Sequence, residues 1–348
     1  MVDRWAAALL LTTLAGCAGS GTAPEPAELT PIVTPADALS GDPRAEAARA
    51  AAAAGRYEQA RQAYEALLAS ETDPARRGEL VFLAAECALG ASDFHRAATL
   101  YQRVLSDHPG SPRFGQAVER VFQVGRLFCL GQATRPSWFF GVEFTNHEFG
   151  IRVLERFRDA RERHPLADDA LHAIALAHVE LGEYEKAQAS WETVIREYPT
   201  SEWVDTAHYR AALAVLATGS GARYDKAPLR ETVARLRRYQ QLFPTGNHAQ
   251  EVQAQLEELN EELAAHELAV ARFYLGRSRP YAADLYLAAI LRDYPGTEAA
   301  VDALALRTSL PRTSPPAAAS GLRGLELEDE EQRQDRLRLA PAPIDDSW

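Results

Sequence analysis

The sequence predicts an all-α fold built from repeated helix pairs, and three observations lead to this prediction. Alanine is abundant and β-branched residues are few among the 348 residues, which favours helices over strands. Amphipathic stretches alternate with short turns that contain proline, and these turns read HPGS, HPLA, YPTS, FPTG and YPGT (108–111, 164–167, 198–201, 243–246 and 294–297). A small residue lies twelve positions before three of the prolines, at Ala97, Ala187 and Ala283.

The spacing of these prolines identifies the repeat. Successive prolines lie 56, 34, 45 and 51 residues apart, and 34 residues is the period of the tetratricopeptide repeat. The segments GRYEQA (55–60) and GEYEKA (182–187) supply its central motif. In that motif glycine ends the first helix, the aromatic side chain packs between helices, and alanine lets the helices approach closely, while proline ends the second helix. We therefore predict a tetratricopeptide-repeat solenoid, a right-handed superhelix of about six helix pairs with a concave face.

A lone cysteine near the N-terminus predicts where the protein is held. Residues 5–16 form an apolar stretch that fits a signal peptide but is too short to span a bilayer. The sequence LAGC (14–17) resembles a bacterial lipobox, in which the thiol of Cys17 accepts a diacylglyceryl group. The alternative is an ordinary cleaved signal with an incidental cysteine. Ala18 stands where aspartate would favour inner-membrane retention, so the resemblance to Gram-negative lipoproteins implies the periplasmic face of the outer membrane.

The chain divides by composition into four parts. We expect a signal peptide at 1–16, the lipidated cysteine and a flexible tether at 17–43, the solenoid at 44–306, and a disordered acidic tail at 307–348. The expected repeat units are 43–74, 78–111, 113–167, 168–201, 202–246 and 247–297, with insertions at about 131–148 and 217–228.

Composition and motifs point away from catalysis and from nucleic acid. The net charge of −12 opposes the phosphate contacts that nucleic-acid binding needs. The sequence HEF (147–149) lacks the second histidine of a zinc-binding HExxH motif, and the six-residue separation of His172 and His178 does not place them on one helix face. We expect no enzyme activity, no metal site and no cofactor. Cys87 and Cys129 leave two interpretations open, a disulfide or two buried free thiols.

Binding is the function that remains, and in this repeat the first helix of each pair lines the concave surface. Counting from the alanine and proline markers places charged, amide, aromatic and aliphatic side chains there, a mixture that suits an extended peptide with an apolar anchor. The peptide-binding candidates are Arg49, Glu79, Phe82, Glu86, Arg113, Gln116, Arg120, Gln123, Asp169, His172 and Leu176. The alternative is that these positions are simply solvated helix faces.

The insertion at 131–148 is unusually aromatic for a loop. Together with the residues that follow it, this stretch contains five aromatic side chains: Trp138, Phe139, Phe140, Phe144 and Phe149. Packing over the solenoid explains them in one interpretation, and a loop that docks a partner explains them in the other.

The last third of the chain resembles a known family. Residues 262–304 read ELAAHELAVARFYLGRSRPYAADLYLAAILRDYPGTEAAVDAL and are similar to the C-terminal repeat of the BamD family of outer-membrane assembly lipoproteins. The resemblance implies a non-enzymatic scaffold in the machinery that folds β-barrel proteins into the outer membrane. It implies unfolded barrel precursors as partners of units 1–3, and the barrel-forming subunit and accessory lipoproteins as partners of units 5–6. The membrane would be a further partner, contacted through the lipid anchor.

A different periplasmic tetratricopeptide adaptor, serving envelope maintenance or division, is the alternative function. Soluble division adaptors have a signal without a lipobox and often an N-terminal coiled coil, whereas this chain has Cys17 and no heptad run before its first unit. The chain departs from the BamD pattern in its additional unit, its aromatic insertion and its acidic tail. No pocket residue is therefore carried over from the family.

Overall fold

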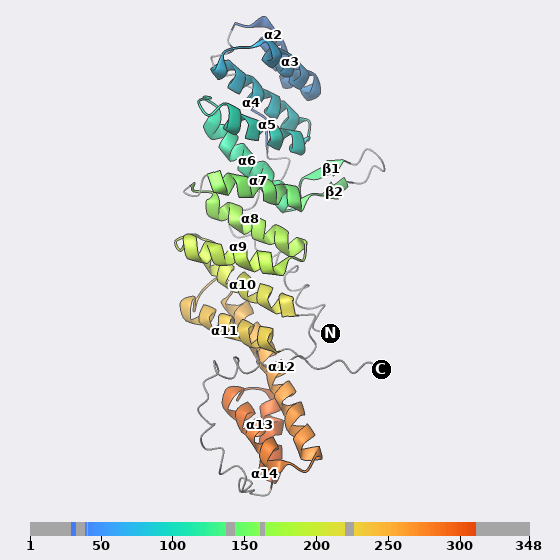
Figure 1. The fold of residues 1–348 in the computed structure, drawn as a ribbon, viewed down its shortest axis with the longest axis vertical. Helices are drawn as coiled ribbons and strands as arrows, with labels where there is room; N and C mark the ends of the chain where they lie inside the picture. Colours follow the sequence, from blue (N-terminus) through green and yellow to red (C-terminus); the bar gives the residue numbers. More distant parts are fainter. Residues whose placement is uncertain are drawn as a thin grey trace, which may run out of the picture. The chain divides into compact units, whose positions relative to one another are not determined.

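The computed structural model describes residues 29–32, 39, 41–136, 143–160, 164–219 and 226–310. These residues form thirteen α-helices and one short two-stranded sheet (Figure 1). The chain divides into two compact units, Met1–Leu256 and Glu257–Trp348. The expected signal peptide, Cys17 and nearly all of the expected acidic tail lie outside the described residues.

The first unit is a stack of helix pairs. The pairs are α2 (Pro43–Ala53) with α3 (Tyr57–Ser70), α4 (Pro74–Gly90) with α5 (Phe94–Asp107), α6 (Phe114–Cys129) with α7 (His147–Ala160), α8 (Ala167–Glu180) with α9 (Tyr184–Glu197), and α10 (Val204–Thr218) with α11 (Ala227–Leu242). From α2 to α11, each helix packs against the next along the chain, both within a pair and between pairs (Figure 1).

The second unit begins within the long helix α12 (Ala249–Gly276) and continues through α13 (Pro280–Asp293) and α14 (Glu298–Ser309). Its core contains Ala264, Leu268, Ala271, Leu287, Ile290, Ala299, Ala300 and Ala303. The carboxylate of Glu261 accepts hydrogen bonds from the backbone N–H groups of Glu298 and Ala299 at 2.7 and 3.1 Å, so α12 caps the start of α14. The sixth pair and a closing helix complete the all-α repeat fold that the sequence predicts.

The alanine and aromatic positions of the motif form the core between helices. Ala60, Ala97 and Ala187 have no exposed surface, which fits the close approach of paired helices at these points. Four residues after each alanine, a large aromatic side chain is also buried: Tyr64, Tyr101 and Trp191. Burial of one such side chain is worth about 1.5–3 kcal/mol, so each unit depends on its neighbours for stability.

The turns within pairs use the left-handed backbone conformation. Gly55 and Gly182 have φ values of 74° and 72°, where a side chain would be strained. Ser92 occupies the corresponding place between α4 and α5, with a φ of 60°. The motif therefore specifies this turn through its backbone conformation, and glycine is the residue that adopts it without strain.

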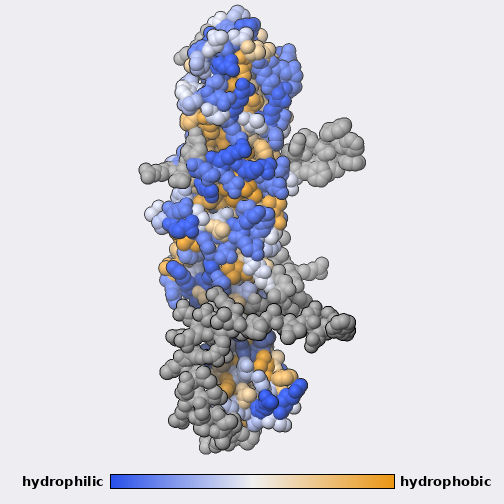
Figure 2. Space-filling view, viewed as in Figure 1, coloured by the Kyte–Doolittle hydropathy of each residue, from blue (hydrophilic) through white to orange (hydrophobic). Residues whose placement is uncertain are grey.

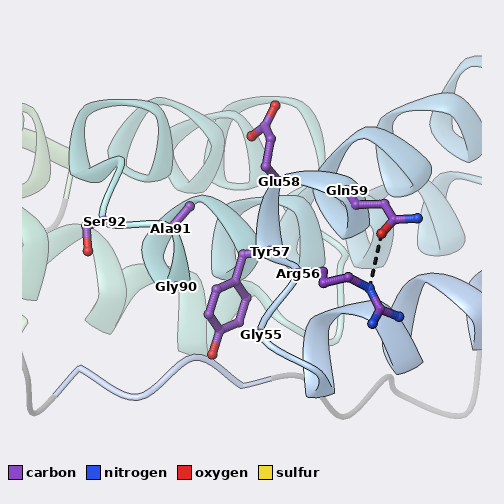
Figure 3. Close-up of a pocket in the computed structure, with 8 residues that line it drawn as sticks. All are labelled: Gly55, Arg56, Tyr57, Glu58, Gln59, Gly90, Ala91 and Ser92. Atoms are coloured by element: carbon purple, nitrogen blue, oxygen red, sulfur yellow. Dashed lines mark hydrogen bonds between the residues drawn. The ribbon is translucent and has the colours of Figure 1, made fainter.

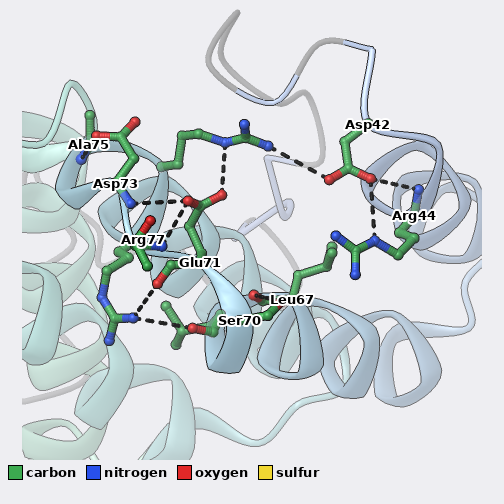
Figure 4. A network of polar contacts seen from close by, with 11 residues as sticks. Asp42, Arg44, Leu67, Ser70, Glu71, Asp73, Ala75 and Arg77 are labelled. Carbon is green, nitrogen blue, oxygen red and sulfur yellow. Dashed lines mark hydrogen bonds and ion pairs between the residues drawn. The ribbon is translucent and has the colours of Figure 1, made fainter.

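A polar network joins the first two helix pairs (Figure 4). The side chain of Arg77 donates to the backbone oxygens of Leu68 and Glu71 at 3.2 and 2.7 Å, which satisfies carbonyl groups at the end of α3. Arg76 forms ion pairs with Glu71 at 2.9 Å and with Asp42 at 3.6 Å. These contacts fix the end of α3 against the starts of α2 and α4.

The visible surface of the first unit is mainly hydrophilic, with hydrophobic side chains in bands between the polar ones (Figure 2). Among the described residues, no helix combines the length and the apolar character needed to cross a membrane.

The insertion between α6 and α7 differs from an all-helical expectation. It contains two short antiparallel strands, β1 (Thr134–Pro136) and β2 (Glu143–Thr145), in which Thr134 pairs with Thr145 (Figure 1). The helical period does not extend through this insertion, so its ends pair with each other as a hairpin.

Candidate peptide-binding groove

The predicted groove positions form contacts between neighbouring units at the repeat period. Glu79 meets Arg113, Glu86 meets Arg120, and Asp169 meets Trp203, each pair 34 residues apart. A spacing of 34 residues places the two partners at the same position of successive first helices. The structure therefore brings most candidates together, but as partners of one another.

Glu79 and Arg113 form the first of these contacts. The guanidinium Nε of Arg113 donates to both carboxylate oxygens of Glu79, at 3.1 and 2.9 Å, and Nη2 donates to Oε1 at 3.1 Å. The Arg113 group also lies 5.4 Å from the ring centroid of Phe82 and donates to Gln116 at 2.8 Å. Glu79 and Phe82 are buried, with no exposed side-chain surface, so both are unavailable to a ligand here. The prediction that they line a groove is therefore wrong, and both residues instead hold the guanidinium group of Arg113 in position.

Glu86 and Arg120 form the second contact, seven residues or about two helical turns further along α4 and α6. Arg120 donates from Nε and Nη2 to the two oxygens of Glu86 at 2.9 and 3.2 Å. The hydroxyl of Tyr101 donates to Glu86 at 2.8 Å, and Nη1 of Arg120 donates to Gln123 at 3.2 Å. Glu86 and Tyr101 both have no exposed surface, and the burial of Tyr101 together with the nearby Glu86 carboxylate raises the pKa of Tyr101 well above its usual value.

Part of the expected tether lies against this pair. The backbone N–H of Ile32 donates to Glu86 Oε2 at 2.5 Å, and Arg120 Nη2 donates to the backbone oxygen of Thr30 at 2.7 Å. Leu29 is buried and Ile32 is half-buried, and both pack against the hydrophobic core of the first unit. The expectation of a uniformly flexible tether over 17–43 is therefore corrected at 29–32, where two apolar side chains supply a docking contact.

Asp169, His172 and Leu176 occupy the corresponding face of α8. The indole N–H of Trp203 donates to Asp169 at 2.7 Å, and the rings of Trp203 and His172 stack with centroids 3.9 Å apart. Burial and the nearby guanidinium groups of Arg210 and Arg126 lower the pKa of His172 to about 3, so this imidazole is neutral at neutral pH. Leu176 is half-buried, as are Asp169 and His172.

Two residues at this face are absent from the sequence-based candidates. Trp203 and Arg210 lie 34 residues after Asp169 and Leu176, so continuing the count by one unit finds both of them. Arg210 is buried within α10. At the other end of the stack, the predicted Arg49 lies exposed on α2.

The aromatic insertion is only partly within the described residues. Trp138, Phe139 and Phe140 lie outside them, and Phe144 belongs to β2, where its backbone pairs with Arg135. Phe149 lies in α7, where its ring stacks on His95 at 4.2 Å and meets Phe128 edge-on at 4.9 Å. For Phe149, the packing interpretation is therefore correct.

A shallow hollow of about 630 Å³ lies between the turns that join α2 to α3 and α4 to α5 (Figure 3). It is lined by Gly55, Arg56, Tyr57, Glu58, Gln59, Gly90, Ala91 and Ser92. None of the predicted groove residues is among them. Arg56 is turned toward Gln59, to which it donates at 3.1 Å, and we assign this hollow no function.

The cysteines and potential metal ligands supply no further site in the described part of the chain. Cys87 and Cys129 are free and buried, and burial raises the pKa of the Cys87 thiol to about 12. No group of three or more histidine, cysteine, aspartate or glutamate side chains in these residues is arranged to hold a metal ion.

Comparisons with known proteins place the chain beside outer-membrane lipoproteins. Residues 151–317 match the family model YfiO, described as an outer membrane lipoprotein, and residues 46–112 match a tetratricopeptide-repeat model. Outer membrane protein assembly factor BamD from Pasteurella multocida is 26% identical over 166 residues, which cover 45% of this chain and 64% of that relative. The chain has a tetratricopeptide-repeat fold and is similar to BamD over part of its length. BamD from Caulobacter vibrioides is 22% identical over 190 residues, covering 51% of this chain and 62% of that relative.

The similarity to BamD covers part of each protein. The aligned parts span less than two thirds of the length of either curated relative. The match at 151–317 begins in α7, so the Glu79–Arg113 and Glu86–Arg120 pairs precede it. A solved structure, the C-terminal part of a tetratricopeptide-repeat protein from Cytophaga hutchinsonii, aligns over 87% of this chain and 99% of its own at 15% identity, with a TM-score of 0.38.

Proposed function

We propose that this protein is a non-enzymatic lipoprotein scaffold of the machinery that assembles β-barrel proteins in the outer membrane. The match of residues 151–317 to an outer membrane lipoprotein family carries the proposal, and both curated relatives are named outer membrane protein assembly factors. Lipidated Cys17 would hold the protein at the periplasmic face of that membrane. Two acyl chains or more on this residue suffice for stable anchoring.

The two ends of the repeat array would serve different partners. Units 1–3 would receive unfolded barrel precursors, and the Glu86–Arg120 pair of α4 and α6 supports this assignment because it can hydrogen-bond an extended main chain. Units 5–6 would dock the barrel-forming subunit and accessory lipoproteins. This part of the proposal is supported by four exposed large hydrophobic side chains in the compact unit that begins at Glu257: Phe273, Leu285, Val301 and Leu304.

Affinity purification from membranes, after chemical cross-linking in cells, tests the assignment of partners. We expect the barrel-forming subunit to co-purify with the native chain and to be lost with Leu285→Glu and Leu304→Glu, whose side chains are 56% and 53% exposed. Leu181→Glu is the matched control, because this leucine is also exposed, at 39%, but lies after α8 in the first unit. Failure to recover a barrel-forming subunit with the native chain would refute the proposal.

The anchor has its own test. We expect the native chain to fractionate with the outer membrane and Cys17→Ala to be released into the soluble periplasmic fraction once partner contacts are disrupted by high salt. If the variant stays with the membrane under these conditions, Cys17 is not the anchor.

A further inference from the structure

The Glu86–Arg120 pair has the chemistry of a main-chain clamp. One carboxylate oxygen of Glu86 accepts the N–H of Ile32, and one guanidinium nitrogen of Arg120 donates to the C=O of Thr30, so both contacts are to backbone atoms. Charge-assisted hydrogen bonds of this kind are about twice as strong as neutral ones. Because the two side chains also bind each other, each holds the other in position for an incoming peptide.

The bound segment shows what the clamp selects. The clamp contacts the C=O of residue 30 and the N–H of residue 32. Pro31 lies between them and has no N–H group that would need a partner. Leu29 and Ile32 both pack against the core of the first unit. The selected feature is thus a short extended stretch with apolar residues three positions apart, a pattern that many polypeptides can present.

We propose that residues 29–32 are an intramolecular ligand that closes the clamp of Glu86 and Arg120, and that an extended apolar segment of a client protein binds there by displacing them. The identity of the client as an unfolded barrel precursor rests on the proposed function, whereas the displacement does not. The segment connects to the solenoid through Leu39, which is buried in the same core, so only a short stretch of chain separates ligand and receptor. Short tethers give effective concentrations of about 1 mM, so a client displaces the segment when the ratio of its concentration to its own Kd exceeds the same ratio for the tethered segment.

The test uses a fluorescent peptide with the chain's own sequence, residues 27–34 (AELTPIVT), added to the full mature protein. Binding is followed by fluorescence anisotropy. In Leu29→Asp/Ile32→Asp the tethered segment is released because two carboxylates cannot occupy its apolar seats. We expect this variant to bind the peptide at least about ten-fold more tightly than the native chain, since the competitor is gone. Thr30→Asn, at an exposed side chain, is the matched control and should bind as the native chain does.

Two controls examine the clamp itself. Adding Arg120→Ala to the released variant should abolish peptide binding. A peptide that carries N-methyl-isoleucine at the position of Ile32 keeps the side chain but lacks the N–H, and we expect it to bind at least about ten-fold more weakly. Equal binding of the methylated and unmethylated peptides, or equal binding by native and released proteins, overturns the proposal.

A measurement on the native chain avoids dependence on variants that fail to fold. Hydrogen–deuterium exchange should show protection at the Ile32 amide, and protection should disappear when an unfolded barrel-protein C-terminal peptide saturates the site. Rapid exchange at Ile32 in the free protein overturns the proposal. If the released variant binds its own segment but no barrel-protein peptide, the intramolecular ligand stands and the proposed function in barrel assembly fails.

Discussion

Removal of Arg120 should destabilise the first unit strongly, because it leaves a buried negative charge. Glu86 has no exposed surface, and its α4 carboxylate contacts Tyr101 on α5, Arg120 on α6 and the segment at 29–32. In Arg120→Ala, the carboxylate keeps only the hydrogen bonds from Tyr101 and Ile32 and loses its countercharge. Breaking a buried pair in this way costs about 3–5 kcal/mol.

Urea denaturation followed by far-ultraviolet circular dichroism measures this cost. With a slope of about 3 kcal/mol per molar urea, the transition midpoint should fall by about 1–1.7 M in Arg120→Ala. Arg103→Ala is the matched control, since Arg103 pairs with Asp107 at 3.3 Å while the two side chains are 44% and 51% exposed. Exposed pairs contribute about 0–1 kcal/mol, so the midpoint of this control should hardly move.

A double substitution separates the buried charge from the loss of packing. In Glu86→Gln/Arg120→Met the glutamine still accepts a hydrogen bond from Tyr101, and no unpaired charge remains. We expect this protein to recover most of the stability lost in Arg120→Ala, because neutral replacement of a buried pair is often tolerated. The reasoning is refuted if the double variant is no more stable than Arg120→Ala, or if Arg120→Ala costs no more than Arg103→Ala.

Three further predictions follow from the described contacts. His172 has its pKa lowered to about 3, so between pH 6.5 and 3 the unfolded chain binds more protons than the folded one and stability falls as pH falls. Between pH 7 and 5 the native chain should lose about 2 kcal/mol more of its unfolding free energy than His172→Phe, which keeps the ring stack; equal losses would contradict this. Gly182→Ala should lower the free energy of unfolding, measured by thermal unfolding, by about 1 kcal/mol more than Gly110→Ala does. Both sites have open space for a methyl group, but only Gly182 has a left-handed φ, of 72°. The buried thiols of Cys87 and Cys129 should react with a thiol reagent only after unfolding in urea, and labelling of the native chain would show that they are accessible.

The helix pairs could be predicted because their signals are local. Each proline and each alanine of the motif acts within its own unit, and the burial of Ala97 and Ala187 follows from the contact between two consecutive helices. The signals are also redundant, since turn, alanine and aromatic positions agree on one register. A fold repeated in this way is specified several times by the same sequence.

The burial and pairing of the groove residues could not be predicted in the same way. Glu86 is a plausible surface residue within its own unit, and it becomes buried only because Arg120 in the next unit neutralises it. Comparison of positions 34 residues apart would have found this pair and the Glu79–Arg113 pair. The docking of residues 29–32 has a weaker signal, two apolar residues in a stretch rich in proline, and no spacing rule connects them to α4 and α6.

The intramolecular ligand also connects client binding to the anchor. With Cys17 lipidated as proposed and Leu29 held against the core, the intervening chain reaches at most about 40 Å from the membrane, at 3.3–3.6 Å per residue. When a client displaces residues 29–32, the chain is next held at Leu39, and the maximum reach becomes about 75 Å. Capture of a client and release of the tether would then be the same event, so a loaded scaffold could move further from the membrane than an empty one.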